Sequence, residues 1–265
     1  MNKKILVIAV AALAGTLIAG GAMAKKDQCV DIPEEDGVYE VAGHPNMKVR
    51  VIVHKAKPAP APTFKPICGV DGGSDAVVGY GGHKLPANWN YYLNINSVPN
   101  SVGGNNLESI AQRAFNVWTS QIDGKVNIAY SGTTAIARAK LDGRNIISWG
   151  NASASALAVT YIWYYENTGV TVELDTIMNK IYVWSWADQN EKPEICSAYP
   201  SWAWSDSYDS QHILTHELGH WFGLNDHYTA AYTNNTMYGY GAKGDAKYNT
   251  PTNGDIAGLR AIYGL

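Results

Sequence analysis

The pattern of apolar and polar residues along the 265-residue chain predicts a mixture of strands and helices. Apolar residues recur at helical spacing within residues 105–120, which we expect to form an amphipathic helix. A final helix is predicted over about residues 253–263, and a central one begins where Asp209 or Ser210 can cap it. Runs rich in β-branched and aromatic residues predict strands at 38–41, 48–53, 89–96, 125–130, 145–149, 156–165 and 170–178, with 181–186 as an extension.

Changes in composition divide the chain into four segments. Residues 1–24 begin with lysines, continue as an apolar run and end in Ala22-Met23-Ala24, which is typical of a secretory signal peptide cleaved after about Ala24. An uncleaved membrane anchor is the alternative, because the apolar run approaches spanning length. The remaining segments are a short β segment (25–54), a proline-rich linker or propeptide region (55–82) and the main domain (83–265).

The charge balance and the cysteine count bear on partners and compartment. Removing residues 1–24 takes away two lysines and no acidic residue, so the net charge moves from −3 to −5. This negative charge argues against nucleic acid as a partner. We expect a secreted monomer that meets a membrane only through its signal peptide during export. In an oxidising compartment one pair of the three cysteines, Cys29, Cys68 and Cys196, can bond and one is left over.

One stretch carries the candidate chemistry. His216 and His220 stand four residues apart, so on a helix they project from one face and can bind one metal ion. Glu217 comes directly after the first histidine and can reach a metal-bound water without being a ligand. This is the H-E-x-x-H signature of a zinc hydrolase. The alternative, a helix with two core histidines, does not explain the glycine and the ligand-type residues that come next in the chain.

A third ligand is expected just beyond that helix. Gly223 lets the chain leave the helix in a conformation that is costly for residues with a Cβ atom. After that turn the chain can present either Asp226 or His227 to the metal. The other histidines, His44, His54, His83 and His212, have no ligand spacing, and we interpret them as structural or exposed.

At this point the sequence resembles the matrixins of the metzincin clan. His216 to Asp226 fits the extended pattern H-E-x-x-H-x-x-G-x-x-H/D, and Asn235 to Gly239 resembles the Met-turn. Residues 253–264 are similar to the last matrixin helix and residues 114–118 to the first. The similarity covers roughly residues 83–265 and is closest to the bacterial and archaeal branch.

The resemblance implies a secreted zinc endopeptidase in which Glu217 is the general base. Most matrixins carry a third histidine where this chain has Asp226, but snapalysin-type metzincins have aspartate there. We therefore favour Asp226 over His227, since carboxylate is a normal zinc ligand. A zinc amidase or esterase is one alternative function. An inactive secreted binding or surface protein of the same fold is another.

The fold implied by the resemblance is the α+β metzincin fold. It has a twisted, mostly parallel five-stranded sheet with one antiparallel edge strand, the zinc-binding helix, the Met-turn and a C-terminal helix. The edge strand would be Leu157 to Tyr164, and its residues Leu157, Ala158, Val159 and Thr160 would pair with an extended substrate. The alternative is an ordinary edge strand.

Further roles come from the same resemblance. Met237 would form an apolar floor under the zinc. Tyr240 is a candidate oxyanion stabiliser, although simple packing is favoured. Asp255 would bond the Met-turn backbone or cap the last helix. Gly254 stands where matrixins often have a second aspartate that receives the processed N-terminus.

Two expectations concern other ligands of the metal and other cations. The segment from Pro66 to Asp71 resembles the matrixin cysteine-switch segment, in which a thiolate such as that of Cys68 would occupy the open zinc position. A Cys68–Cys196 disulfide is favoured over this switch. Ca²⁺ is a second candidate cation in a structural role, although the acidic clusters form no recognisable calcium loop. These clusters are Asp188, Glu191 and Glu194, and Asp206 and Asp209.

Overall fold

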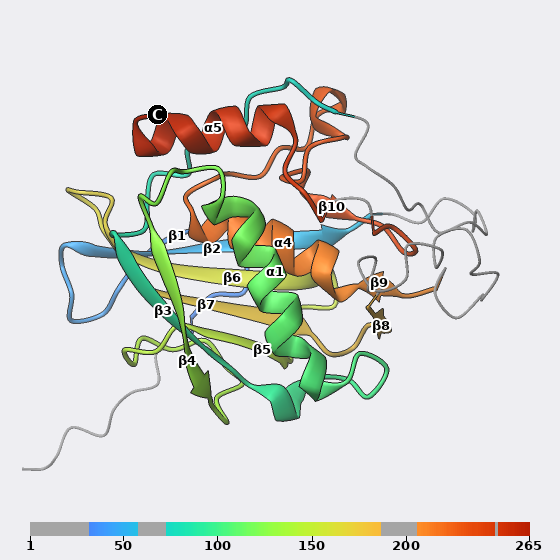
Figure 1. Cartoon of the computed structure of the whole chain (residues 1–265). Coiled ribbons are helices and arrows are strands. Elements are labelled where there is room, and N and C mark those ends of the chain that lie inside the picture. Colours follow the sequence, from blue (N-terminus) through green and yellow to red (C-terminus); the bar gives the residue numbers. More distant parts are fainter. Residues whose placement is uncertain (1–31, 58–72, 187–205, 247–248) are drawn as a thin grey trace, which may run out of the picture. The chain divides into compact units, whose positions relative to one another are not determined.

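The computed structural model describes residues 32–57, 73–186, 206–246 and 249–265, which together form an α+β unit (Figure 1). Within these residues there are three α-helices: α1 (Leu107–Thr119), α4 (Ser210–Trp221) and α5 (Asn253–Tyr263). The strands are β1 (Gly37–Glu40), β2 (Met47–Ala56), β3 (Asn88–Leu93), β4 (Asn127–Thr133), β5 (Ile146–Gly150), β6 (Ala156–Tyr165), β7 (Thr171–Asn179), β8 (Trp184–Ser185), β9 (Tyr208–Asp209) and β10 (Tyr240–Gly241).

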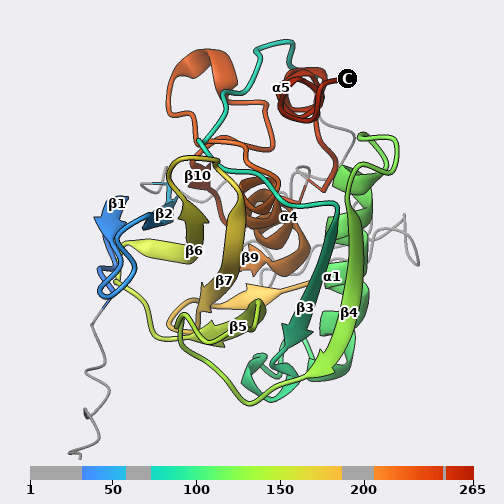
Figure 2. The ribbon, with the colours of Figure 1, turned by 90° about the vertical axis from the view of Figure 1, so that its left-hand side faces the viewer.

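Eight of these strands form one mixed sheet in the order β1-β2-β6-β7-β5-β3-β4, with β10 paired to β2. The pairs β1/β2, β2/β6 and β6/β7 are antiparallel, and the other pairs of this sheet are parallel. Strands β8 and β9 form a separate parallel pair. The sheet curves around α4, with α1 on the same side (Figure 2).

The core has two parts, which reflect the alternation of side chains along β6. Ala158 and Ile162 of β6 belong to the larger cluster, which also contains the buried faces of α1 and α4. Val159 and Trp163 belong to a second cluster, which is shared with alternate residues of β2. Strand β6 is therefore covered on both of its faces.

Most of the predicted elements are confirmed. Strand β6 and helix α5 have the predicted bounds, and α1 lies within the predicted helix at 105–120. The predicted strands at 38–41 and 48–53 are β1 and β2. The run at 181–186 yields only the two-residue strand β8. Periodic patterns of this length are the strongest local signal for an element.

The prediction of a five-stranded sheet with β6 as its antiparallel edge is wrong. The sheet has eight strands, and β6 lies inside it, because β2 pairs with its outer side from Met47 to Lys55. Alternate β2 residues such as Val49 and Val51 are buried against β6, which removes apolar surface from water on that side. The described residues on both sides of the boundary expected within 55–82 belong to one compact unit.

Several predictions fall on residues that lie outside the described ranges. They are the signal peptide, the linker stretch 58–72, and the alternatives for Cys68 and Cys196. No helix among the described residues is long and apolar enough to cross a membrane.

Candidate metal centre

Helix α4 carries the centre and is buried along its whole length. Its first turn is capped by Asp209, whose side chain accepts from the backbone N–H of His212 at 2.8 Å. The indole N–H of Trp118, on α1, donates to the carbonyl of Thr215 at 2.8 Å. A helix fixed at its start and along its side holds the side chains at 216, 217 and 220 in place.

Three acceptor atoms converge at this helix. The Nε2 atoms of His216 and His220 lie 3.1 Å apart. Asp226 Oδ1 lies 3.0 Å from His216 Nε2 and 3.3 Å from His220 Nε2. Ligand atoms about 2.0–2.1 Å from a tetrahedral ion would lie about 3.3 Å from one another. These residues could therefore hold one metal ion.

The orientation of both imidazoles is set by backbone carbonyls. His216 Nδ1 donates to Thr236 O at 2.7 Å, and His220 Nδ1 donates to Leu224 O at 2.9 Å. Carbonyls can only accept, so the Nδ1 atoms carry protons and the Nε2 atoms face Asp226. Burial acts to lower the pKa of His216, but Asp226 outweighs it and the pKa is raised. The charge that favours a proton here would equally favour a cation.

Asp226 reaches the centre through the turn that the sequence predicts. Gly223 has φ of 100°, and a Cβ atom there would lie 2.3 Å from the carbonyl oxygen of His83. The second oxygen of Asp226 accepts from the hydroxyl of Tyr228 at 2.9 Å. Burial acts to raise the pKa of Asp226, but His220 and His216 hold it well below its usual range.

His227, the alternative third ligand, lies elsewhere. Its Nε2 atom accepts from the backbone N–H of Gly79 at 2.9 Å. Its ring stacks on Tyr232, with centroids 3.9 Å apart. Of the two candidates, the structure brings Asp226 to the imidazoles and uses His227 to hold the strand-like stretch around Gly79.

Both carboxylate oxygens of the fully buried Glu217 are hydrogen-bonded. Oε2 accepts from Thr160 Oγ1 at 2.6 Å. Thr160 is bonded in turn to Thr176 at 2.7 Å, and Thr176 accepts from the indole N–H of Trp221 at 2.9 Å. Because an indole can only donate and a carboxylate can only accept, both threonine hydroxyls in this series of hydrogen bonds donate in the direction of Glu217. The side chain of Thr160 thus supports the Glu217 carboxylate, and the strand of Thr160, β6, is not an exposed edge of the sheet.

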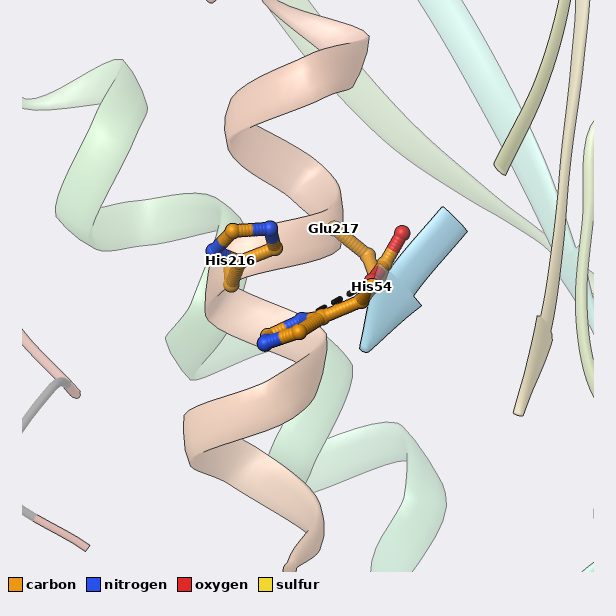
Figure 3. A group of neighbouring side chains, drawn as sticks. All are labelled: His54, His216 and Glu217. Atoms are coloured by element: carbon orange, nitrogen blue, oxygen red, sulfur yellow. Dashed lines mark hydrogen bonds and ion pairs between the residues drawn. The ribbon is translucent and has the colours of Figure 1, made fainter. Parts of the chain in front are cut away.

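The other oxygen of Glu217 meets His54. Figure 3 shows this histidine reaching from its strand, β2, toward the helix that carries His216 and Glu217. His54 Nδ1 donates to Glu217 Oε1 at 3.2 Å, and its ring lies 3.8 Å from that of His216. Burial and His216 lower the pKa of His54 to about 4. Burial acts to raise the pKa of Glu217, but His54 and the nearby imidazoles lower it.

The interpretation of His54 as merely structural or exposed is therefore incomplete. Spacing rules for metal ligands compare residues within one element, and His54 comes from a strand more than 160 positions away. The alternation of residues 48–54 offered the one usable signal, since it puts His54 on the same face as the charged Arg50. His83 bonds the carbonyl of His220 at 2.7 Å, and His212 bonds that of Asp245 at 2.8 Å.

The turn around Met237 packs directly under the helix. A Cβ atom at Gly219 would lie 2.2 Å from Met237 Sδ, so only glycine allows this approach. Asp255 accepts from the backbone N–H of Thr236 at 2.8 Å and from that of Met237 at 3.3 Å. It also completes a capping box with Thr252 at the start of α5, so both predicted roles of Asp255 are observed.

The remaining candidates make contacts with other groups. The ring of Tyr240 contacts those of Tyr228 and Tyr238, with centroids 5.1 and 5.6 Å apart. Of the acidic residues considered for calcium, Asp206 pairs with Lys243 and Asp209 caps α4. The other cluster, Asp188, Glu191 and Glu194, lies outside the described residues.

No known protein-family model matches the chain, and no curated protein matches it.

Proposed function

We propose that this chain is a secreted zinc-dependent endopeptidase of the metzincin type, acting on extended polypeptide. The observation that carries the proposal is the convergence of His216, His220 and Asp226 beside a buried carboxylate, Glu217. Two imidazoles and one carboxylate suit zinc with an open fourth position. The resemblance of the Met-turn and of the last helix supports the same family.

Zinc bound by these residues would polarise the scissile carbonyl and lower the pKa of a water to about 7. Glu217 is the general base: it takes the proton of the attacking water and delivers it to the leaving amine. The hydroxyl of Thr160, 2.6 Å from Oε2, fixes the rotamer of the carboxylate. Met237 fills the space beneath the helix and keeps water out of that side of the centre.

A substitution of the general base tests the proposal. We expect Glu217→Gln to keep the metal, because no ligand is lost, and to lose peptidase activity by about two to four orders of magnitude, because proton transfer is removed. The measurement is hydrolysis of casein and of a quenched fluorescent peptide, with and without a chelator, by the whole chain and by the chain cut within residues 58–72, beside the zinc content of each protein. The variant is compared with wild type in the form in which wild type is active. Glu108→Gln, on the exposed side of α1, is the matched control. Retention of near wild-type activity in Glu217→Gln would exclude this mechanism.

A further inference from the structure

Strand β2 lies between two segments beside the metal centre. On one side it pairs antiparallel with β6. On the other side its last two residues, Lys55 and Ala56, pair in parallel with β10, which comes shortly after Met237. The backbone N–H of Lys55 donates to Gly239 O at 3.3 Å. The next such bond runs from Lys57 N–H to the carbonyl of Gly241, at 2.8 Å. The strand is therefore held on both edges.

Alternate side chains of β2 face the metal centre. His54 bonds Glu217 and packs against His216, as Figure 3 shows. Arg50, on the same face, donates to Asn225 Oδ1 at 2.6 Å, and Asn225 directly precedes Asp226. The segment thus contacts both the general base and the loop that supplies the third ligand.

The register between β2 and β6 is irregular where the strand passes Glu217. His54 lies opposite Ala158, but Lys55 lies opposite Ala156, which leaves Leu157 as an extra residue on β6. Bulges of this kind re-aim neighbouring side chains. The regular pairing of β2 and β6 is therefore interrupted, and the strands are bent, where they pass the Glu217 carboxylate.

The consequence is a closed centre. The side chains of His216, His220 and Glu217 have no exposed surface. A cavity of about 300 Å³ reaches Asp226, but Arg50, Val51 and Ile52 of β2 form part of its wall. An extended peptide that adds to the sheet must hydrogen-bond along a free strand edge. The edge of β6 beside Glu217 is already taken by residues 47–55.

We propose that residues 47–57 are an intramolecular pseudosubstrate: they fill the peptide-binding cleft of the proposed endopeptidase, and His54 blocks Glu217. This inference rests on the proposed function. The intact chain is latent, and a substrate binds in the same place, antiparallel to β6 and parallel to β10, once the segment has left. The latency is caused by His54 and by strand β2, which both belong to the described residues.

The first experiment tests the block at Glu217 in the intact, zinc-loaded chain. Acetohydroxamate, a small zinc-binding probe, is titrated into wild type and His54→Ala by calorimetry. We expect the variant to bind it roughly tenfold or more tightly, because the competent state no longer has to displace the imidazole. The control is His44→Ala, in the exposed turn that precedes β2, which should bind like wild type. Equal affinity in wild type and His54→Ala would overturn the role of His54.

The second experiment tests the strand. A recognition sequence for a site-specific protease is inserted after Lys57, and the chain is compared before and after cutting, with both pieces present. We expect a peptide hydroxamate to bind the cut chain roughly tenfold or more tightly, because the segment can then be displaced. Unchanged affinity, or unfolding of the cut chain seen by circular dichroism, would overturn the proposal by making β2 a permanent strand.

Binding and turnover separate this inference from the proposed function. Tighter probe binding after cutting, together with no peptide hydrolysis, supports the pseudosubstrate and refutes the endopeptidase. Hydrolysis by the uncut chain at the rate of the cut chain, with unchanged probe affinity, refutes the pseudosubstrate and leaves the endopeptidase standing. Tighter binding accompanied by the onset of hydrolysis supports both.

Discussion

At the residue scale, the centre depends on how one carboxylate is used. Asp226 has one oxygen on the hydroxyl of Tyr228 and the other within 3.3 Å of both imidazole Nε2 atoms. The oxygen beside the imidazoles, Oδ1, is buried and receives no hydrogen bond in the described structure. A buried oxygen without a donor beside two ring nitrogens is best satisfied by a cation.

We expect Asp226→Ala to lose most of its zinc and His227→Ala to retain it. The first change removes a ligand, whereas the second removes only a bond to the N–H of Gly79 and a stack on Tyr232. The zinc content of the purified variants, measured by mass spectrometry after dialysis, distinguishes them. Zinc retention in Asp226→Ala with loss in His227→Ala would reverse the assignment of the third ligand.

At the element scale, α5 supports the metal centre without touching it. Asp255, in its first turn, fixes the backbone N–H groups of Thr236 and Met237. The carbonyl of Thr236 in turn accepts from Nδ1 of His216. A helix at the end of the chain therefore sets the position of a ligand on α4 through the turn between them.

Loss of that support should weaken the metal site. In Asp255→Asn a buried carboxylate that accepts several N–H bonds becomes a neutral amide with one acceptor oxygen. We expect zinc affinity to fall by about 10-fold, the lower end of the effect of losing a ligand's direct partner, because Asp255 acts on His216 through the backbone of Thr236. Competition with a chromophoric chelator measures this. Asn253→Ala, in the exposed first position of the same helix, is the control, and an equal loss of affinity in both variants would contradict the proposed support.

Elements were easier to predict from the sequence than their neighbours in the sheet. The bounds of β6 and α5 come from periodicity, which is local. The pairing of β2 with β6 joins residues more than 100 positions apart, and no local pattern specifies it. The same reason explains why His216, Glu217 and His220 could be predicted as a site while His54 could not. Strand β10, at two residues, is too short to give a pattern at all.

At the scale of the whole molecule, stability should depend on a buried acid that is not part of the metal centre. Glu173, in β7, accepts the backbone N–H of Asp142 at 2.8 Å and that of Gly143. Burial raises its pKa to about 7, against an ordinary value of 4.5. The folded chain holds this proton more tightly than the unfolded chain does. Its contribution to stability is therefore complete below about 4.5 and is lost as the pH rises through about 7.

We therefore expect wild type to lose stability relative to Glu173→Gln as the pH rises from about 5 to about 8. The free energy of unfolding by urea is measured for both proteins across this range, and the difference between them is the quantity of interest. Glu108→Gln controls for the loss of one carboxylate from the chain. A difference that stays constant, or that grows in favour of wild type with pH, would show that Glu173 is not held in its protonated form.

The covalent attachment of β2 to the rest of the chain sets the effective concentration at which the strand competes with a substrate. The strand is joined to the part of the chain that carries the metal centre, which begins at residue 73, at one end only, through the 15 residues from 58 to 72. A ligand tied by a short connection is present at an effective concentration of about millimolar, whatever the dilution of the protein. A substrate at micromolar concentration therefore competes at a disadvantage of roughly a thousandfold against a strand of equal affinity. After one cut behind β2 the segment is a separate molecule. Its concentration is then that of the protein in solution, and it falls each time the protein is diluted.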